Sequence, residues 1–232
     1  MIEVILLSSL FIVCSFMLLK PWLQKKIQIA RWLKHYQIKQ HEDTFNQLYQ
    51  SVNGFVVSKK ARAFHDMPEL TYGEIDFKSF IALIGGCFPD KNTVFYDLGS
   101  GTGKAVIAIA MVFDIKKSCG IECLEPLHRA AINTKKKWLN ELTDTYPESQ
   151  IEFYNQDFLQ SNFKDATLIF INASALFGPV WDELCSHLKK TPIGTIIITT
   201  SKSIKDESFQ LTYSKPTMMS WGVVTAYIHK RL

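Results

Sequence analysis

The chain has 232 residues, of which 47% are hydrophobic and 21% are charged, and its formal net charge is +4. These values indicate a folded protein with one globular domain and an appendage, and they exclude a disordered or low-complexity chain. The five cysteines are scattered along the sequence. None forms a Cys-x-x-Cys pair, so the sequence indicates neither a disulfide framework nor a metal site.

The first twenty residues are predicted to form a hydrophobic helix that anchors the chain in a membrane. Residues 2–19 are apolar except for Glu3, three serines and one cysteine, and this run is long enough to cross a bilayer. Its flanks lack the basic start and the small-residue cleavage site of a secretory signal. The alternative is a buried N-terminal helix.

A basic segment follows the apolar one. The net charge of the whole chain is +4, and the six positive charges of this segment leave −2 for the other residues. The main domain therefore lacks the basic surface that nucleic-acid binding requires. Basic residues flank membrane spans on the cytoplasmic side, which predicts a membrane-anchored protein with a cytoplasmic main domain. We expect an anchor at 1–20, a basic juxtamembrane helix at 21–52 and the domain at 53–232. The basic residues of this segment are Lys20, Lys25, Lys26, Arg31, Lys34 and Lys39.

The rest of the chain alternates strand and helix patterns after a connecting region that ends near Gly73. Two apolar runs at the C-terminus, 209–214 and 222–229, follow each other directly and predict an antiparallel hairpin. The pattern predicts an α/β, Rossmann-like fold with a seven-stranded, mostly parallel sheet that ends in this hairpin. The other predicted strands are 93–98, 117–122, 150–154, 166–171 and 194–199, and the predicted helices are 77–87, 103–113, 125–140 and 178–190.

A glycine-rich turn joins the first predicted strand to the helix after it. Residues 97–103 read Asp-Leu-Gly-Ser-Gly-Thr-Gly, and Glu122 ends the next strand, 23 residues after Gly99. Glycines let a ligand approach the backbone closely, and an acid at the second strand tip can accept hydrogen bonds from both hydroxyls of a ribose. The turn therefore predicts a nucleoside-cofactor site.

The residues around the turn favour S-adenosylmethionine as the cofactor. A dinucleotide rests its pyrophosphate on the helix N-terminus, where the carboxylate of Asp97 would repel it. The same carboxylate would attract the ammonium group of S-adenosylmethionine, which carries no phosphate. The spacing Gly99-x-Gly101-x-Gly103 also differs from the dinucleotide pattern. Dinucleotide binding and a purely structural turn are the alternatives.

Further motifs follow in a fixed order. They are Thr71-Tyr72-Gly73-Glu74-Ile75, the segment Phe95 to Lys104, Gly120-Ile121-Glu122, Gln156-Asp157-Phe158-Leu159, Phe170-Ile171-Asn172, Phe177-Gly178-Pro179, Ser201-Lys202, Trp221 and Tyr227-Ile228-His229. Over residues 50–232 this order resembles the catalytic core of the disruptor-of-telomeric-silencing type (non-SET) histone-lysine methyltransferases. That family has the class I S-adenosylmethionine-dependent methyltransferase fold. The chain departs from it in a segment 172–177 that is one residue longer and in Lys104, where a glutamine is usual.

The resemblance implies a cofactor site and a lysine channel. Asn172 would lie by the methyl group, while Tyr227, Trp221 and Phe177 would line the channel. Taken alone, these residues also allow other roles, such as a helix N-cap for Asp157, a turn cap for Asn172, a turn aromatic for Tyr72 and strand packing for Tyr227 and Trp221. The implied cofactor-binding residues are Tyr72, Gly73, Glu74, Ile75, Phe95, Tyr96, Asp97, Leu98, Gly99, Ser100, Gly101, Thr102, Gly103, Lys104, Glu122, Asp157 and Phe158.

The expected function is therefore S-adenosylmethionine-dependent N-methylation of a protein lysine, with a histone as the implied substrate. The predicted anchor raises a second possibility, a membrane-tethered enzyme that acts on a membrane-proximal protein. A cofactor-binding scaffold without turnover is the third. The expected partners are a protein that bears the lysine and, through the N-terminal helix, a membrane.

Overall fold

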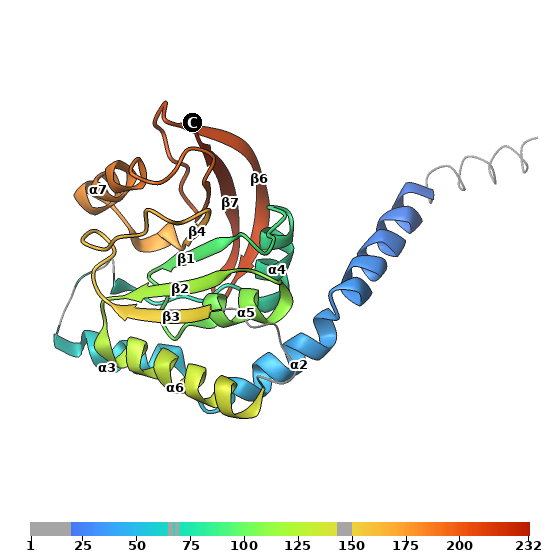
Figure 1. Cartoon of the computed structure of the whole chain (residues 1–232), viewed down its shortest axis with the longest axis horizontal. Helices are drawn as coiled ribbons and strands as arrows, with labels where there is room; N and C mark the ends of the chain where they lie inside the picture. Colours follow the sequence, from blue (N-terminus) through green and yellow to red (C-terminus); the bar gives the residue numbers. More distant parts are fainter. Residues whose placement is uncertain (1–19, 65–66, 68–69, 143–149) are drawn as a thin grey trace, which may run out of the picture. The chain divides into compact units, whose positions relative to one another are not determined.

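The computed structural model describes residues 20–64, 67, 70–142 and 150–232 (Figure 1). The chain divides into two units, Met1–His41 and Glu42–Leu232. In the first unit, residues 20–35 are helical. The second unit contains the sheet and all the predicted site residues.

A seven-stranded sheet forms the centre of the second unit, in the order β3-β2-β1-β4-β5-β7-β6. Strands β1 to β5 are parallel, and β7 runs antiparallel to both β5 and β6. This confirms the predicted mostly parallel sheet with its C-terminal hairpin. The strands are β1 (Val94–Leu98), β2 (Lys117–Glu122), β3 (Gln150–Asn155), β4 (Leu168–Ile171), β5 (Ile196–Thr200), β6 (Phe209–Met219) and β7 (Gly222–Arg231).

Helices cover both faces of the sheet, because successive side chains of a strand point to opposite faces. Phe95 of β1 packs against Phe80 of α4, with ring centroids 6.1 Å apart. Tyr96 and Leu98 of the same strand join the apolar cluster that includes Leu184 of α7. The helices are α2 (Ile38–Leu48), α3 (Gly54–Ala61), α4 (Phe77–Gly85), α5 (Lys104–Val112), α6 (Glu125–Glu141) and α7 (Gly178–Leu188), with 3-10 turns η1 (Arg62–Phe64) and η3 (Ala173–Ala175).

The topology creates a crevice at the carboxyl ends of β1 and β4. Strand order reverses here, since the chain passes from β1 outward to β2 and β3 and then returns to β4 on the other side of β1. Ligands of open α/β sheets bind at such a switch point. Asp97 and Asn172 lie at these two strand ends.

Two local predictions before the sheet were wrong. The region between Asn53 and Gly73 is not only a connection, because it contains α3, whose first turn is capped by a hydrogen bond from the Val56 amide to Asn53 Oδ1 (3.1 Å). The helix predicted at 21–52 is not continuous. It breaks at Gln37, whose φ of 46° is left-handed, and α2 begins at the next residue.

The hydrophobic helix predicted at residues 1–20 lies, except for Lys20, outside the described residues. None of the helices in the described ranges is long and apolar enough to cross a membrane.

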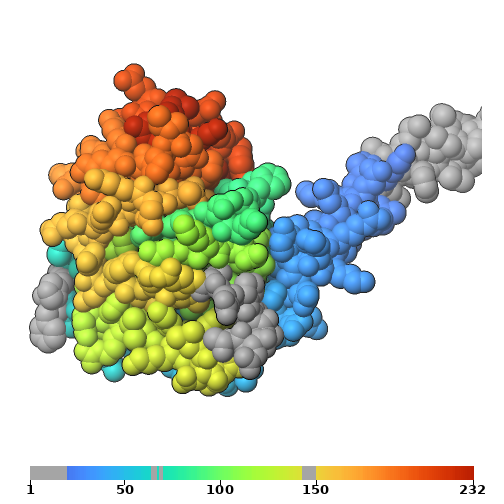
Figure 2. All heavy atoms as spheres, in the orientation of Figure 1, coloured from blue at the N-terminus to red at the C-terminus, as the bar shows by residue number. Residues whose placement is uncertain are grey.

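The edge strand β6 is irregular. Its pairing with β7 shifts by one residue between Leu211 and Tyr213, which is a β-bulge. Pro216, further along, has no backbone N–H to donate. The far end of β6 turns toward the centre of the domain, where its Met218 carbonyl accepts a hydrogen bond from the Asp76 amide (3.1 Å). Figure 2 shows the C-terminal hairpin in red and the α7 region in orange on one continuous surface.

Candidate active site

The glycine turn has the backbone geometry that its sequence predicts. Gly99, Gly101 and Gly103 have φ values of 84°, 54° and 80°, a left-handed conformation that side chains with a Cβ rarely adopt. The amides of Gly99 and Ser100 both donate to the Ile121 carbonyl at 2.9 Å. The turn is therefore fixed to the end of β2, the strand that carries Glu122.

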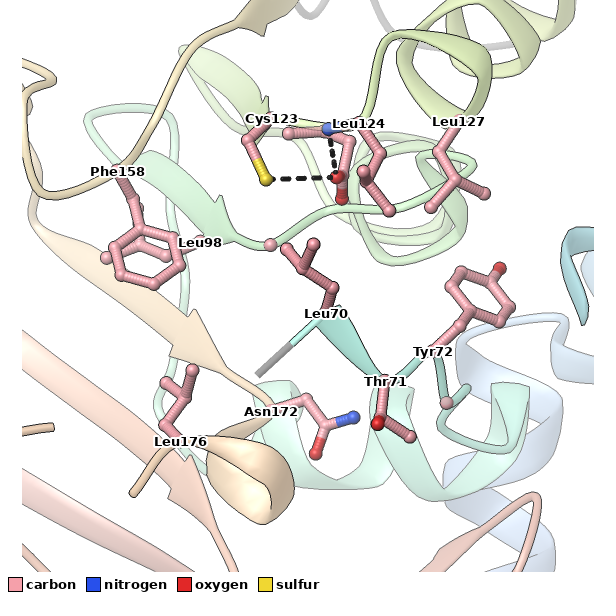
Figure 3. A pocket seen from close by; sticks show the side chains of 13 residues that line it. Leu70, Thr71, Tyr72, Leu98, Cys123, Leu124, Leu127, Phe158, Asn172 and Leu176 are labelled. Carbon is pink, nitrogen blue, oxygen red and sulfur yellow. Dashed lines mark hydrogen bonds between the residues drawn. The ribbon is translucent and has the colours of Figure 1, made fainter. Parts of the chain in front are cut away.

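Glu122 is held by the backbone on both of its oxygens. Oε2 accepts a hydrogen bond from the Gly101 amide at 2.8 Å. Oε1 accepts one from the Leu124 amide, also at 2.8 Å, which is dashed in Figure 3. The residue is only 7% exposed, and burial raises its pKa while the two amides act in the opposite direction. The carboxylate is thus fixed at the strand tip, where it can receive a diol.

Asp97 is the second buried acid of the site and is 5% exposed. Burial, together with the nearby Glu122 carboxylate, raises its pKa to about 8. Beside it, the buried Ser100 Oγ has no hydrogen-bond partner among the described residues. A buried hydroxyl without a partner and a buried carboxyl group that can ionise near pH 8 are both suited to a polar, cationic ligand group.

Tyr72 lies over the glycine turn and takes part in a polar network. Its hydroxyl donates to Glu74 Oε1 (2.6 Å) and lies 3.0 Å from Thr102 Oγ1. The other Glu74 oxygen accepts from Lys104 Nζ at 2.7 Å. A Cβ added at Gly101 would lie 2.5 Å from the Tyr72 ring. Burial and Glu74 raise the pKa of Tyr72, which keeps its hydroxyl protonated as a donor.

The Tyr72 segment is attached to the turn of the C-terminal hairpin. The Ser220 amide donates to the Glu74 carbonyl (2.8 Å), and Ser220 Oγ accepts from the Glu74 amide (3.2 Å). Trp221 lies directly against Gly73, where an added Cβ would overlap the indole ring. Trp221 therefore contacts the segment that covers the glycine turn.

Two small cavities that share Tyr72, Gly73, Gly99 and Asn172 lie beneath this segment, and we call them together the cofactor cavity. Their volumes are about 70 Å³ and 40 Å³. Ligand pockets commonly measure about 300–1,000 Å³, so these two cavities are smaller than a pocket for a whole nucleoside cofactor. The larger cavity is lined by Leu70, Thr71, Leu98, Glu122, Cys123, Leu124, Leu127, Phe158 and Leu176 (Figure 3), and the smaller one by Glu74, Ile75, Asp97, Ser100, Lys104, Ala105, Phe170 and Met219.

Asn172 presents its amide nitrogen to the cofactor cavity (Figure 3). Its Oδ1 accepts hydrogen bonds from the Ser174 amide (3.4 Å), the Ser174 hydroxyl (2.9 Å) and the Thr200 hydroxyl (2.9 Å). A backbone amide can only donate, so this contact identifies the oxygen. Asn172 thus caps the turn η3, which is the other role that its sequence position allowed. Its Nδ2 is the hydrogen-bond donor on the cavity side.

A larger depression, which we call the outer groove, lies between α7 and the residues after β5. Its volume is about 700 Å³, and its lining includes Trp181, residues 201–206 and Tyr227. Tyr227 pairs with Thr199 across β5 and β7. The structure therefore places Tyr227 in the outer groove and Trp221 on the cofactor side, although both were predicted to line one channel.

Several predicted cofactor residues support the site without lining it. Phe95 is in the core, and the Tyr96 hydroxyl donates to Asp165 Oδ1 at 2.9 Å on the α7 face. Gly103 permits close packing, since a Cβ there would lie 2.5 Å from the Phe153 ring. Asp157 caps its own turn by accepting from the Leu159 amide (2.9 Å). Thr102 acts through its contacts with tyrosine hydroxyls, including that of Tyr49 on its carbonyl (3.3 Å).

The apolar lining of the cofactor cavity was missed from the sequence. Cys123 and Leu124 directly follow Glu122, so their place beside the ribose acid could have been inferred from adjacency. Leu70, Leu127 and Leu176 carried no such signal, because leucine at these positions fits ordinary core packing equally well.

Comparison with protein families identifies the chain. Residues 52–223 match the family model described as histone methylation protein DOT1. The chain belongs to this family. The predicted family of S-adenosylmethionine-dependent histone-lysine methyltransferases is thereby confirmed.

Curated relatives carry the same description. The chain is 33% identical over 144 residues to a Caenorhabditis elegans protein named histone-lysine N-methyltransferase, H3 lysine-79 specific, which covers 57% of this chain and 15% of the relative. It is 24% identical over 161 residues to the protein of that name in Candida glabrata, covering 66% of this chain and 24% of the relative. The chain thus spans at most about a quarter of the length of either relative.

Solved structures with the same fold are methyltransferases of low sequence identity. An RNA methyltransferase from Salinibacter ruber, in complex with S-adenosylhomocysteine, matches with a TM-score of 0.50 at 23% identity, over 66% of this chain and 87% of the other. The magnesium protoporphyrin IX methyltransferase of Synechocystis, with bound S-adenosylhomocysteine, matches with a TM-score of 0.52 at 13% identity, over 79% and 96%. These similarities show the class I methyltransferase fold.

The predicted membrane localisation was wrong. The curated relatives are named for methylation of lysine 79 of histone H3, and neither name refers to a membrane. The prediction rested on apolar composition near the N-terminus. That composition alone does not distinguish a membrane span from other hydrophobic helices.

Proposed function

We propose that this chain is an S-adenosylmethionine-dependent histone-lysine N-methyltransferase with its catalytic domain at residues 53–232. The observation that carries the proposal is the placement of the Glu122 carboxylate, fixed by two backbone amides, in one cavity with the Asn172 amide. A ribose acid and a donor for the reacting end of the cofactor are thus present at the switch point of the sheet.

The residues of the cofactor cavity fit S-adenosylmethionine. Glu122 would accept hydrogen bonds from the ribose hydroxyls, and Asp97 would pair with the ammonium group. Phe158 would stack on the adenine and Asp157 would accept from its amine. A Cβ at Gly99 would have no atom within 4 Å, so this side of the turn is open to a ligand. Ser100 also lines the smaller part of the cofactor cavity.

The methionine end would lie under the segment 72–75. Tyr72 holds Glu74 through its hydroxyl, and Lys104 neutralises the same carboxylate, so this cover is held by hydrogen bonds and is almost uncharged. Bound S-adenosylmethionine supplies an electrophilic methyl group on a sulfonium. Asn172 would orient the reacting groups through its Nδ2 donor and would not act as a base, since a carboxamide does not accept a proton at neutral pH.

The acceptor lysine would enter from the outer groove. A lysine amine is protonated at neutral pH, with a pKa of about 10.4, and must become neutral to react. Aromatic walls lower this pKa by desolvation, and a nearby positive charge lowers it further. Tyr227 and Trp181 supply such walls in the groove, and Phe177 lies at its edge.

A histone is proposed as the substrate because both named relatives act on histone H3 according to their descriptions. These relatives are much longer than this chain, which covers 15% and 24% of their lengths. Mass spectrometry after incubation of the full chain with isotopically labelled S-adenosylmethionine, nucleosomes and free histones would test this. We expect label on a histone lysine.

The matched variants are Asn172→Ala and Asn162→Ala. Asn162 caps a surface turn by accepting from the Lys164 amide (3.2 Å), away from both cavities defined above. Asn172→Ala should reduce histone labelling at least tenfold, about 1.4 kcal/mol in transition-state stabilisation, and Asn162→Ala should not. Label found only on RNA or small molecules, or full activity of Asn172→Ala, would refute the proposal.

A further inference from the structure

Lys202 holds its ammonium group over an aromatic ring. Its ammonium nitrogen lies 3.6 Å from the centre of the Phe177 ring, within the range of a cation–π contact. The same nitrogen donates a hydrogen bond to the Leu176 carbonyl. In the ion pairs found among the described residues, no carboxylate is a partner of Lys202.

This position is at the junction of the two functional regions. Lys202 lines the outer groove together with Tyr227. Leu176, whose carbonyl receives its ammonium group, lines the cofactor cavity together with Asn172 and Gly99. The end of the Lys202 side chain thus points from the substrate side toward the cofactor side.

The backbone before Lys202 is tied to the Asn172 turn. The Thr200 hydroxyl donates to Asn172 Oδ1, and the hydroxyls of Ser201 and Ser174 are 2.9 Å apart. Ser201 has a φ of 66°, a left-handed conformation that is uncommon for a residue other than glycine. The loop that fixes the proposed methyl-orienting residue therefore also aims Lys202 at Phe177.

We infer that Lys202 is a methylation site of this chain, modified by the chain's own active site. This inference rests on the proposed function. Lys202 presents an alkylammonium on the aromatic ring of Phe177 beside the outer groove, as a substrate lysine would be presented to an aromatic wall. Desolvation lowers the pKa of Lys202, which increases the fraction of neutral amine available for reaction.

The reaction balances without any further reactant. Lys202 first loses one proton to water in the outer groove. The neutral Nζ then forms a bond to the methyl carbon of the sulfonium donor, while the carbon–sulfur bond breaks and its electron pair stays on sulfur. The products are a methylated, positively charged Lys202 and S-adenosylhomocysteine.

The test uses the full chain with labelled S-adenosylmethionine, first alone and then with histones. We expect one methyl group on Lys202 by peptide mapping, at a rate independent of protein concentration because the reaction is intramolecular. Lys205 lines the same groove and is the internal control. Lys202→Arg should remove the label, and Lys205→Arg should not. Phe177→Leu should slow Lys202 labelling at least fivefold.

A second measurement needs no cofactor. Stacking on an aromatic face shifts the NMR signals of the Lys202 ε-methylene protons upfield, and Phe177→Leu should remove that shift. Unshifted signals in the unmodified chain would overturn the inference, as would labelling that rises with protein concentration. Label on histones with none on Lys202 would overturn this inference alone. Absence of label from every lysine would overturn the proposed function and this inference with it.

Discussion

The cofactor cavity and the outer groove are built in different ways. In the cofactor cavity, backbone amides fix Glu122 and a short polar network fixes Tyr72. In the outer groove, the functional candidates are large side chains at the surface, and Phe177, whose ring contacts Lys202 of the groove, is 60% exposed. The difference indicates that the polar contacts of the cofactor side form before any ligand arrives, whereas the acceptor side takes its final form with the substrate. Substitutions in the cofactor cavity should therefore change the affinity for the cofactor, and substitutions in the outer groove should change the KM for the histone.

The largest effect should come from pH at the cofactor side. Because the pKa of Asp97 is raised to about 8, the free protein holds this carboxyl group protonated at lower pH, and pairing with an ammonium requires its ionised form. The affinity for S-adenosylhomocysteine should fall by up to about tenfold for each pH unit below 8. Calorimetry at pH 6, 7 and 8 measures this. Asp97→Asn should remove most of the pH dependence, and a wild-type affinity that does not change with pH would contradict it.

Asp97 should also affect stability in the absence of cofactor. A carboxyl group whose pKa is raised in the folded state contributes stability that is complete below its unfolded pKa of about 3.9 and is lost as the pH rises toward 8. Thermal unfolding should therefore show a gain for Asp97→Asn over the wild type that grows between pH 5 and 8.

Removal of the Glu122 charge should weaken cofactor binding almost as strongly. Glu122→Gln keeps one acceptor oxygen but gives up a charge-assisted pair with the backbone amides, so affinity for S-adenosylhomocysteine should fall about 30-fold, about 2 kcal/mol. Glu125→Gln is the matched control, because Glu125 is an exposed helix residue paired with Arg129. Equal affinities of the two variants would show that the buried carboxylate has no role in binding.

A substitution in the outer groove should weaken binding of the histone and leave binding of the cofactor unchanged. Tyr227→Ala removes an aromatic wall, so the KM for the histone should rise about fivefold to tenfold while the affinity for S-adenosylhomocysteine stays unchanged. Steady-state kinetics and calorimetry on the same preparation separate the two constants. A loss of cofactor affinity would mean that the two regions are not independent.

The smallest effect should come from Lys104, the residue that departs from its family. Its ion pair with Glu74 is partly exposed, and such pairs contribute little. Lys104→Gln, which installs the usual residue, should change the affinity for S-adenosylhomocysteine only about twofold to threefold. A change above tenfold would indicate that the ion pair holds the whole Tyr72 segment in place.

The same contrast explains how much could be predicted from sequence. The sheet, the glycine turn and the acid at Glu122 follow from local patterns, since strand, turn and acid lie within about thirty residues of one another. The positions of Trp221 and Tyr227 do not follow from local patterns. They depend on how β7 pairs with β5 and β6 and on which face of the sheet each residue occupies. A shift of one residue reverses those faces. Helix α3 was missed for a different reason, because Asn53-Gly54 reads as a turn although it starts a helix.

The irregular edge strand has a consequence for how this chain can bind another protein. A regular edge offers a row of free amides and carbonyls to which another chain can add as a further strand. The bulge at Leu211 and the missing amide at Pro216 interrupt that row in β6. We therefore expect substrate recognition to depend on side chains around the outer groove and not on strand addition, so a short, flexible peptide should be a much poorer substrate than a folded histone surface.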